Sequence, residues 1–236
     1  MKINGHQNLK YIKKKVLFCG RKNDKYSIKI IELLKKKNIS LKFFLSDSKK
    51  KITKKEKNLI YLDNYDFIFS FRSHIIINIK KINKKCVSIN FHPGPPNYRG
   101  IGCVNFALLN KEKYYGATAH IMNSIIDSGP ILSVMKFRIS NKISLEKILE
   151  KTYKLQFKQF KKITNELFKN KENIKNLLKK NKNIKWSKKL YLKKDLMKLY
   201  NLANYTKKYE VSDLLRATLT EKFKPYFKFK NMIFKL

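Results

Sequence analysis

The chain has 236 residues, 43% of them hydrophobic, and carries 56 lysines and arginines against 16 aspartates and glutamates, a formal net charge of +40. This length and the 16 Phe and 13 Tyr suit one folded domain with an appendage and argue against a disordered chain. No apolar stretch reaches the roughly 20 residues that span a bilayer, and the basic N-terminus lacks the apolar run of a secretory signal. Three widely spaced cysteines without a CxxC argue against a disulfide framework or a zinc finger and predict a cytoplasmic location.

The excess of positive charge first suggests a nucleic acid or another anionic surface as partner. However, only five of the basic residues are Arg, the side chain that contacts phosphate and guanine through paired hydrogen bonds. The basic residues are also uneven, with 24 in residues 1–85, 26 in 143–236 and six in 86–142. The charge therefore indicates a lysine-rich composition in both outer parts of the chain. The middle segment, 86–142, departs from this composition, which indicates that the identity of its residues is the most constrained.

Short apolar strands alternate with helices in the first half of the chain. Strands are predicted at 15–20, 40–45, 66–71 and 86–91, a helix at 26–37, and a Lys-rich solvated loop or helix at 48–58. The helix is expected to bury one face, formed by Ile28, Ile30, Ile31 and Leu34. This alternation predicts an α/β fold with an open, mostly parallel sheet. No GxGxxG and no GxxxxGK[ST] accompanies it, which argues against dinucleotide and P-loop sites.

The second half is predicted to complete this unit and to add a small extension. A helix is expected at 103–110, strands at 115–122 and 131–138, and a long amphipathic helix at 144–169. We therefore predict a catalytic domain at 1–170, a Lys-rich linker at 171–190 and a small C-terminal α+β extension at 191–236. Within the extension, we expect helices near 194–202 and 212–217 and a hairpin of 222–229 with 232–236.

The passage 89–102, INFHPGPPNYRGIG, combines polar groups with turn residues. Strand alternation places Asn90 and His92 on one face, at a carboxyl end of the kind where open α/β sheets bind ligands. Asp127 follows 35 residues after His92, before another Gly/Pro turn. An amide can donate to a developing oxyanion, and an imidazole supported by a carboxylate can exchange a proton. The set favours attack of a substrate amine on an acyl-type carbonyl; the alternative is that Asn90 and His92 only cap the turn.

Three strings in this region resemble the N10-formyltetrahydrofolate-dependent formyltransferase family: NFHPGPPNYRG at 90–100, YGATAH at 115–120 and IDSG at 126–129. Their order and spacing agree with the family over roughly residues 15–140. The resemblance implies a Rossmann-like sheet, N10-formyltetrahydrofolate as co-substrate without a metal, and Asn90, His92 and Asp127 as the catalytic triad.

The resemblance also implies how the ligands are held. The pterin would be bound largely by backbone groups of two loops, which contain Ser73, His74, Ile75 and Ile76, and Asn123 and Ile126. Tyr98 and Arg99 flank the mouth and are candidates for contact with the acceptor, with packing of the turn as the alternative. His120 is expected to be a hydrogen-bonded supporting group, and Trp186 to anchor the linker to the core.

Several acceptors are compatible with this resemblance. The turn sequence HPGPP, the string GIGCVNFAL at 100–108 and the tail string LRAT at 215–218 resemble sugar N-formyltransferases, which implies a nucleotide-linked aminodeoxysugar for surface polysaccharide synthesis. Methionyl-tRNA and glycinamide ribonucleotide are the alternative acceptors, although the extension is too short for the β-barrel that methionyl-tRNA formyltransferases add for tRNA. A basic nucleic-acid-binding protein on a formyltransferase scaffold is the non-enzymatic alternative, and association as a homodimer stays open.

Overall fold

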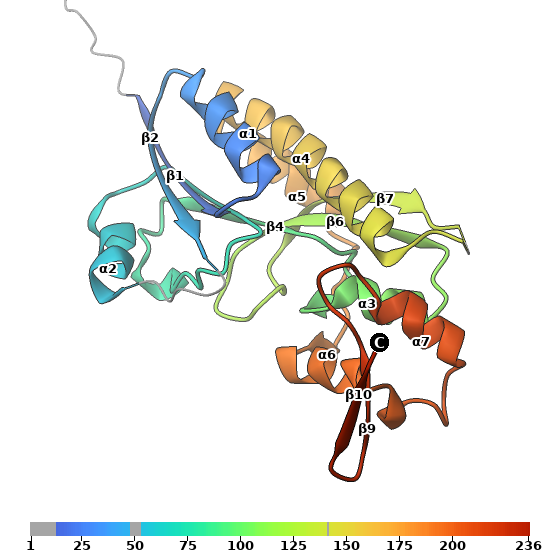
Figure 1. Ribbon diagram of the computed structural model, residues 1–236. Helices are drawn as coiled ribbons and strands as arrows, with labels where there is room; N and C mark the ends of the chain where they lie inside the picture. The colour runs from blue at the N-terminus through green and yellow to red at the C-terminus, as the bar shows by residue number, and fades with distance from the viewer. Residues whose placement is uncertain (1–12, 48–52, 141) are drawn as a thin grey trace, which may run out of the picture.

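The computed structural model describes residues 13–47, 53–140 and 142–236, so part of the predicted Lys-rich segment, 48–52, lies outside the described residues. A six-stranded sheet with the order β2-β1-β3-β4-β6-β7 runs through the centre (Figure 1). The strands are β1 (Lys14–Arg21), β2 (Ile39–Ser46), β3 (Phe67–Phe71), β4 (Val87–His92), β6 (Tyr114–Ile121) and β7 (Ile131–Arg138). The first four are parallel, and β6 pairs antiparallel with both β4 and β7, which confirms the predicted mostly parallel α/β fold.

Helices cover both faces of this sheet. They are α1 (Lys25–Lys35), α2 (Lys54–Leu62), the 3₁₀ turn η1 (Ile79–Lys81), α3 (Cys103–Leu109), α4 (Leu145–Lys169) and α5 (Asn173–Asn181). Side-chain caps explain where three of them begin: Asp24, Thr53 and Ser144 each accept a hydrogen bond from a backbone N–H in the first turn. The helices predicted at 26–37, 103–110 and 144–169 are confirmed.

Apolar layers on the two faces hold the sheet. Helices α1 and α4 pack on one face through a cluster of aromatic rings, in which Phe91 of β4 lies 4.9 Å from Phe160 of α4 between ring centroids. Ile60 of α2 packs with strand residues on the opposite face. The prediction that Ile28 belongs to the buried face of α1 is wrong, because the buried stripe centres on Ile30, Ile31 and Leu34 and leaves Ile28 47% exposed.

The segment 171–190, predicted as a linker, contains helix α5 and is therefore part of the folded unit. Ile174, Leu177 and Leu178 of this helix pack against the same apolar layer as α4, and the helix contacts β7. Their spacing of three and four residues gives a helical apolar face, which the surrounding lysines obscured in the sequence.

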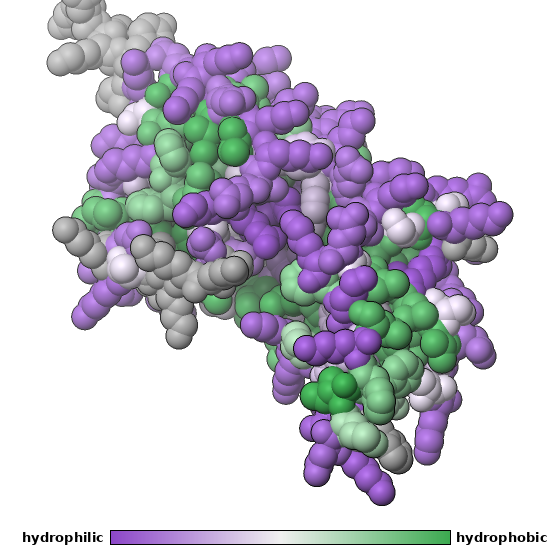
Figure 2. All heavy atoms as spheres, in the orientation of Figure 1, coloured by the Kyte–Doolittle hydropathy of each residue, from purple (hydrophilic) through white to green (hydrophobic). Residues whose placement is uncertain are grey.

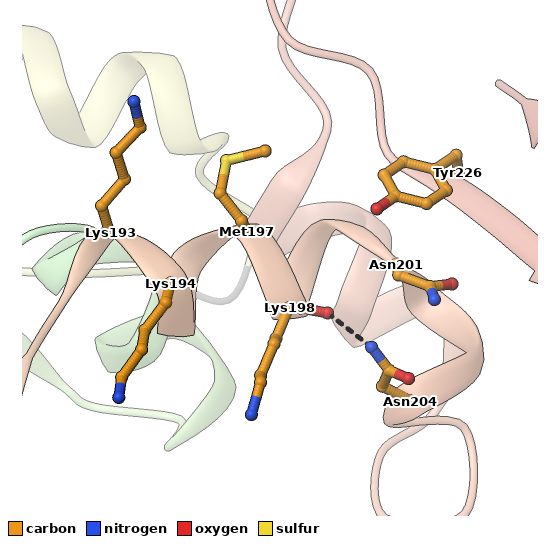
Figure 3. Close-up of a pocket in the computed structure, with 7 residues that line it drawn as sticks. All are labelled: Lys193, Lys194, Met197, Lys198, Asn201, Asn204 and Tyr226. Atoms are coloured by element: carbon orange, nitrogen blue, oxygen red, sulfur yellow. Dashed lines mark hydrogen bonds between the residues drawn. The ribbon is translucent and has the colours of Figure 1, made fainter.

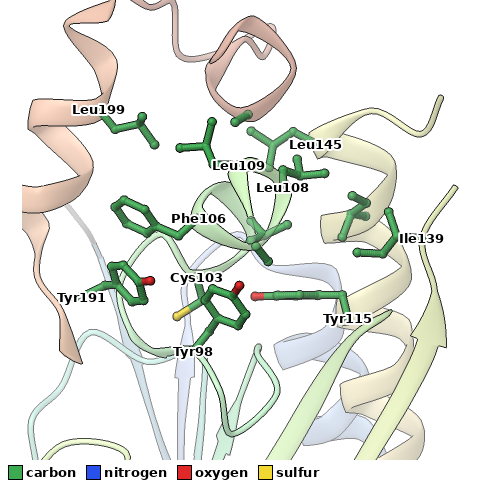
Figure 4. Packing of buried hydrophobic residues seen from close by; sticks show 14 of the residues in the cluster. Tyr98, Cys103, Phe106, Leu108, Leu109, Tyr115, Ile139, Leu145, Tyr191 and Leu199 are labelled. Carbon is green, nitrogen blue, oxygen red and sulfur yellow. The ribbon is translucent and has the colours of Figure 1, made fainter. Parts of the chain in front are cut away.

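The C-terminal extension shares a core with α3 instead of standing apart. Its elements are β8 (Leu190–Tyr191), α6 (Lys193–Tyr200), the 3₁₀ turn η2 (Leu202–Asn204), α7 (Val211–Thr218), β9 (Tyr226–Phe229) and β10 (Met232–Lys235). Tyr191 stacks on Phe106 of α3 at 4.1 Å, and Leu199 packs in the same cluster (Figure 4). The predicted helices and hairpin are confirmed, whereas the pairing of β8 with β5 (Arg99–Gly100) was not predicted.

Hydrophilic side chains cover most of the face seen in Figure 2, and apolar side chains gather on it over the C-terminal elements. The exposed apolar residues there include Met232, Ile233 and Phe234 of β10, each more than half exposed. Among the described residues, no helix combines the length and the apolar character that crossing a membrane requires.

Candidate active site

The candidate catalytic side chains come together at the carboxyl end of β4. Parallel pairing places Asn90 beside Ser70 near the end of β3, and antiparallel pairing places Asn90 opposite His120 of β6. The loop that follows β6 then returns along this edge and brings in Asp127. Asp127 adopts a left-handed backbone conformation, with φ at 44°, which is uncommon for a residue with a side chain.

The carboxylate of Asp127, only 7% exposed, is the centre of the cluster. Its Oδ1 accepts a hydrogen bond from Asn90 Nδ2 at 3.1 Å and lies 3.3 Å from His120 Nε2. Its Oδ2 lies 3.2 Å from His92 Nδ1 and accepts from the backbone N–H of Gly100 at 3.0 Å. The predicted triad is therefore one contact group, to which the structure adds His120 and a backbone donor.

Both ring nitrogens of His92 face acceptors. Nδ1 faces Asp127, and Nε2 lies 2.7 Å from the carbonyl oxygen of Tyr98, to which a protonated Nε2 donates. The thiol of Cys103 also lies 3.9 Å from Nε2. A doubly protonated imidazolium satisfies this arrangement, because each nitrogen then donates to an oxygen.

The charges of His92 and Asp127 shift the two pKa values in opposite directions, each toward the charged form of its group. Burial opposes a charge on His92, but the charge and hydrogen bond of Asp127 outweigh it and hold the pKa of His92 well above its ordinary value. Burial also opposes ionisation of Asp127, yet His92 and His120 outweigh it and lower the pKa of this carboxyl. Both shifts favour the charged forms, an imidazolium beside a carboxylate.

The ion pair predicts a specific dependence of stability on pH. The raised pKa of His92 stabilises the fold fully below about pH 6.5, and this contribution disappears as the pH rises through the raised value. The lowered pKa of Asp127 stabilises the fold above about pH 4, and this contribution disappears as the pH falls. We expect the free energy of unfolding of the wild type to exceed that of His92→Gln by more at pH 6 than at pH 10, as measured by urea titration. An equal difference at both pH values would contradict the ion pair.

Hydrogen bonds from β6 and from the later chain hold the proline turn after His92. Tyr115 Oη donates to the carbonyl of Pro93 at 2.9 Å, and Thr118 Oγ1 donates to that of Gly94 at 2.7 Å. The backbone N–H of Ser187 donates to the carbonyl of Pro96 at 2.9 Å. The turn is therefore fixed by the rest of the fold as well as by its prolines.

The structure buries the polar groups of Tyr98 and Arg99, the predicted acceptor contacts, inside the protein. The hydroxyl of Tyr98 donates to Glu112 and accepts from Asn110, both at 2.9 Å. The guanidinium of Arg99 donates to the carbonyls of Ile126 at 2.7 Å and Ser187 at 3.1 Å. These contacts favour the alternative considered for both residues, packing of the turn.

The two loops predicted to hold the pterin lie close together and present apolar side chains. Ile75 is buried in a cluster against which Met122, just before the second loop, also packs. Ile76 and Ile126 are 79% and 49% exposed. The exposed isoleucines suit a flat apolar heterocycle.

Hydrogen bonds shape the backbone of both predicted pterin loops. The N–H groups of His74 and Ile75 donate to the hydroxyls of Ser46 and Ser73. Asn123 Oδ1 accepts from Ile125 N and from Ser128 Oγ. The loops are therefore held in defined turns by polar groups of their own and by Ser46 of β2.

A cavity of about 880 Å³ opens near the ends of β1 and β3. Arg21 and Arg72 line it at the strand ends, Tyr153 lines it from α4, and residues 220–223 line it from the C-terminal extension. Arg72 pairs with the buried carboxylate of Asp24, and its guanidinium lies 3.4 Å from the ring centroid of Tyr153. Arg72 immediately precedes Ser73, the first residue of the first predicted pterin loop, so the cavity borders that loop. Its size is typical of sites for drug-sized or cofactor-sized ligands.

A second, more open pocket lies in the C-terminal extension and is lined by residues of α6 with Asn201, Asn204 and Tyr226. Its lysines do not converge, because Lys193 points away from Lys194 and Lys198 (Figure 3). We assign it no role. Within the part of the chain that the structure describes, no group of three or more His, Cys, Asp or Glu side chains can hold a metal ion.

Sequence reasoning underrated two residues of the site. Cys103 is the first residue of α3, and its thiol contacts His92. The sequence around Cys103 predicts the start of a helix but not this contact. Trp186 lies 5.0 Å from His120 and 5.8 Å from His92 between ring centroids. Nothing in the Lys-rich sequence around Trp186 indicates this contact, which depends on how the chain returns after α5.

A model of the family described as formyl transferase matches residues 74–164, the part that carries all three candidate catalytic residues. The bifunctional polymyxin resistance protein ArnA of Wigglesworthia glossinidia brevipalpis is 35% identical over 129 residues, which are 48% of this chain and 20% of that protein. The matched parts span only about a fifth of the length of the curated relatives.

Solved structures resemble nearly the whole chain. A 4-N formyltransferase from Francisella tularensis has a TM-score of 0.74 and 22% identity, covering 94% of this chain and 96% of its own. An N-formyltransferase from Helicobacter canadensis, in complex with folinic acid and dTDP-3-aminofucose, has a TM-score of 0.62 and 18% identity, covering 94% and 97%. At these identities the likeness establishes the shared fold. The chain therefore matches the formyl transferase model over residues 74–164 and has the fold of these N-formyltransferase structures.

Proposed function

We propose that this protein transfers a formyl group from N10-formyltetrahydrofolate to the primary amine of a nucleotide-linked aminodeoxysugar. The observation that carries the proposal is the contact group of Asn90, His92 and Asp127 at the carboxyl edge of the sheet. An amide donor, an imidazolium and a carboxylate are the groups that formyl transfer to an amine needs. The formyl transferase domain match supports the same reaction.

In the proposed mechanism, N10-formyltetrahydrofolate supplies the formyl group, and residues of this chain stabilise charge and move one proton. Asn90 donates a hydrogen bond to the formyl oxygen as the amine attacks and negative charge develops there. His92 gives a proton to the departing nitrogen and receives the proton that the attacking amine loses. Asp127 orients His92 throughout and favours its protonated form before the proton leaves and after it is replaced.

Asn90 and His92 must each give up an internal hydrogen-bond partner before they can bond to the reacting atoms. In the free protein, the amide of Asn90 donates to Asp127 and also lies 3.2 Å from His120 Nε2. Nε2 of His92 is held by the carbonyl of Tyr98. Substrate binding therefore replaces internal hydrogen bonds with bonds to the reacting atoms, as is common when a free site receives its ligand.

Two features support the proposed ligands. The exposed isoleucines of the loops around residues 73–76 and 123–126 suit the pterin, and the cavity beside the first loop suits a nucleotide sugar. Arg21, Lys22 and Lys222 on its lining can donate to a diphosphate. Acidic side chains, among them Glu146, Glu150 and Glu221, line the same cavity. The Helicobacter protein of the same fold was solved with a folate derivative and a nucleotide-linked aminosugar, which supports the same pair of ligand classes here.

A formyl-transfer assay with a panel of acceptors tests the proposal. Wild-type protein is incubated with N10-formyltetrahydrofolate and, separately, with aminodeoxysugar nucleotides, glycinamide ribonucleotide and methionyl-tRNA. We expect formylated product with at least one aminosugar nucleotide, and a loss of about 10²–10³ in kcat for Asn90→Ala because one oxyanion donor is removed. Transfer to methionyl-tRNA alone would overturn the acceptor class. Salt-dependent nucleic-acid binding without any transfer would overturn the enzymatic function.

A further inference from the structure

Trp186 joins three parts of the candidate site that are distant in sequence. Its indole Nε1 donates to the carbonyl of Gly129 at 2.8 Å, two residues after Asp127. Its ring packs nearly perpendicular to both imidazoles, at 83° to His120 and 70° to His92. Among the described residues, no other aromatic ring contacts both histidines.

The residue after Trp186 ties the same backbone to the catalytic turn. The N–H of Ser187 donates to the carbonyl of Pro96, and its carbonyl accepts from Arg99 at 3.1 Å. Arg99 in turn donates to the carbonyl of Ile126, on the other side of Asp127. The segment 186–187 is thus tied to both sides of Asp127, directly to Gly129 through the indole and to Ile126 through Arg99, which fixes the ring beside the imidazoles.

The geometry points to Trp186 as a positioning residue, which fixes the Asp127 loop against His92 and His120 and shields the ion pair from water. The kinetic effect of this positioning role rests on the proposed formyl transfer, whereas its structural effect does not. The ring covers the imidazoles, which are each 2% exposed, while Trp186 itself is half-buried and forms part of the wall. Exclusion of water strengthens the charge interaction that keeps His92 protonated.

Two substitutions separate the functions of the indole. Trp186→Ala removes the ring and the hydrogen bond, and we expect kcat to fall by about 10- to 100-fold with a smaller change in KM, because the catalytic groups lose their spacing. Trp186→Phe keeps a ring but loses the bond to Gly129, and we expect a fall of about 3- to 10-fold. In both variants, the pKa of His92 should move from its raised value toward the ordinary one, with the larger movement in Trp186→Ala.

Histidine-selective NMR titration of the full chain measures this pKa without any substrate, with signals assigned by single substitutions of the four histidines. Phe168→Ala is the matched control, because Phe168 is a half-buried ring that packs on Phe67 and Phe69 toward the other end of β3. We expect it to lower the melting temperature while leaving the titration of His92 unchanged. Folded Trp186 variants with native titration of His92 would overturn the inference, and Trp186→Phe alone decides it if Trp186→Ala does not fold.

The kinetic readout separates the two proposals. An active wild type with unchanged kcat in both Trp186 variants would overturn the positioning role and leave the proposed function standing. A wild type without formyl transfer to any acceptor, combined with a shifted titration of His92 in Trp186→Ala, would overturn the proposed function and support the positioning role.

Discussion

Replacing Asp127 by asparagine is expected to lower kcat for formyl transfer by about 10²–10⁴, the range seen when acid–base catalysis is lost. The carboxylate contacts both His92 and Asn90, and its charge is what outweighs the burial of His92. In the variant, burial is opposed only by the smaller contribution of Cys103, so the pKa of His92 should fall below its ordinary value. Histidine NMR titration and initial-rate kinetics on the folded variant measure the two effects.

Asp213→Asn is the control for this substitution. Asp213 forms an ion pair with Lys111 at 3.0 Å on α7, away from the catalytic cluster. The control substitution removes the same charge as Asp127→Asn, but we expect kcat and the titration of His92 to stay unchanged because surface ion pairs contribute little to stability. An Asp127→Asn variant with wild-type kcat would remove the carboxylate from the mechanism, even if the pKa of His92 had moved.

Replacing Gly100 by alanine is expected to lower the free energy of unfolding by about 3 kcal/mol or more, because a strained backbone and a steric clash add. Gly100 has φ at +90°, and a Cβ there would lie 2.1 Å from the carbonyl oxygen of Tyr191. Relief of the clash must separate β5 from β8 and shift the N–H that donates to Asp127. We therefore expect a loss of activity larger than the loss of folded protein at the assay temperature.

Gly102→Ala distinguishes the two causes. Gly102 also has a positive φ, at +73°, but its nearest neighbour would be the flexible side chain of Leu196, at 2.8 Å. We expect a loss of about 1–2 kcal/mol by urea titration, mainly from the backbone. If Gly100→Ala cost no more than Gly102→Ala, the contact between the catalytic turn and β8 would not be a tight one.

Local patterns were enough to predict the sheet and most helices, because strand alternation and helical spacing depend on neighbouring residues. They failed where a helix face packs against an element that is distant in the sequence. The apolar stripe of α5 was hidden among lysines, and Gln156 and Gln159 of α4 are buried although their polar side chains suggest solvent. The amides of these two glutamines donate to the strand carbonyls of Phe91 and Ser133, partners that only the folded chain provides.

The site shows the same contrast between contacts that local patterns predict and contacts that only the folded chain provides. Alternation alone placed Asn90 and His92 on one face, and the structure brings both to Asp127. Tyr98 and Arg99 were expected at the mouth because the turn carries them, but partners just after α3 and beyond α5 draw their polar groups inward. Trp186 has no local signal, since its contacts come from a segment that returns to the site from the far end of the fold.

The pairing of β5 with β8 has a consequence for the order in which the chain acquires its chemistry during synthesis. All six strands of the central sheet precede residue 139, yet Arg99 bonds to Ser187, 88 residues later in the chain. Contacts of this sequence separation form late, after local and sheet contacts have reduced the entropy of loop closure. A nascent chain is therefore expected to bury its sheet before the catalytic turn is locked, and to be inactive until residues 186–191 have left the ribosome.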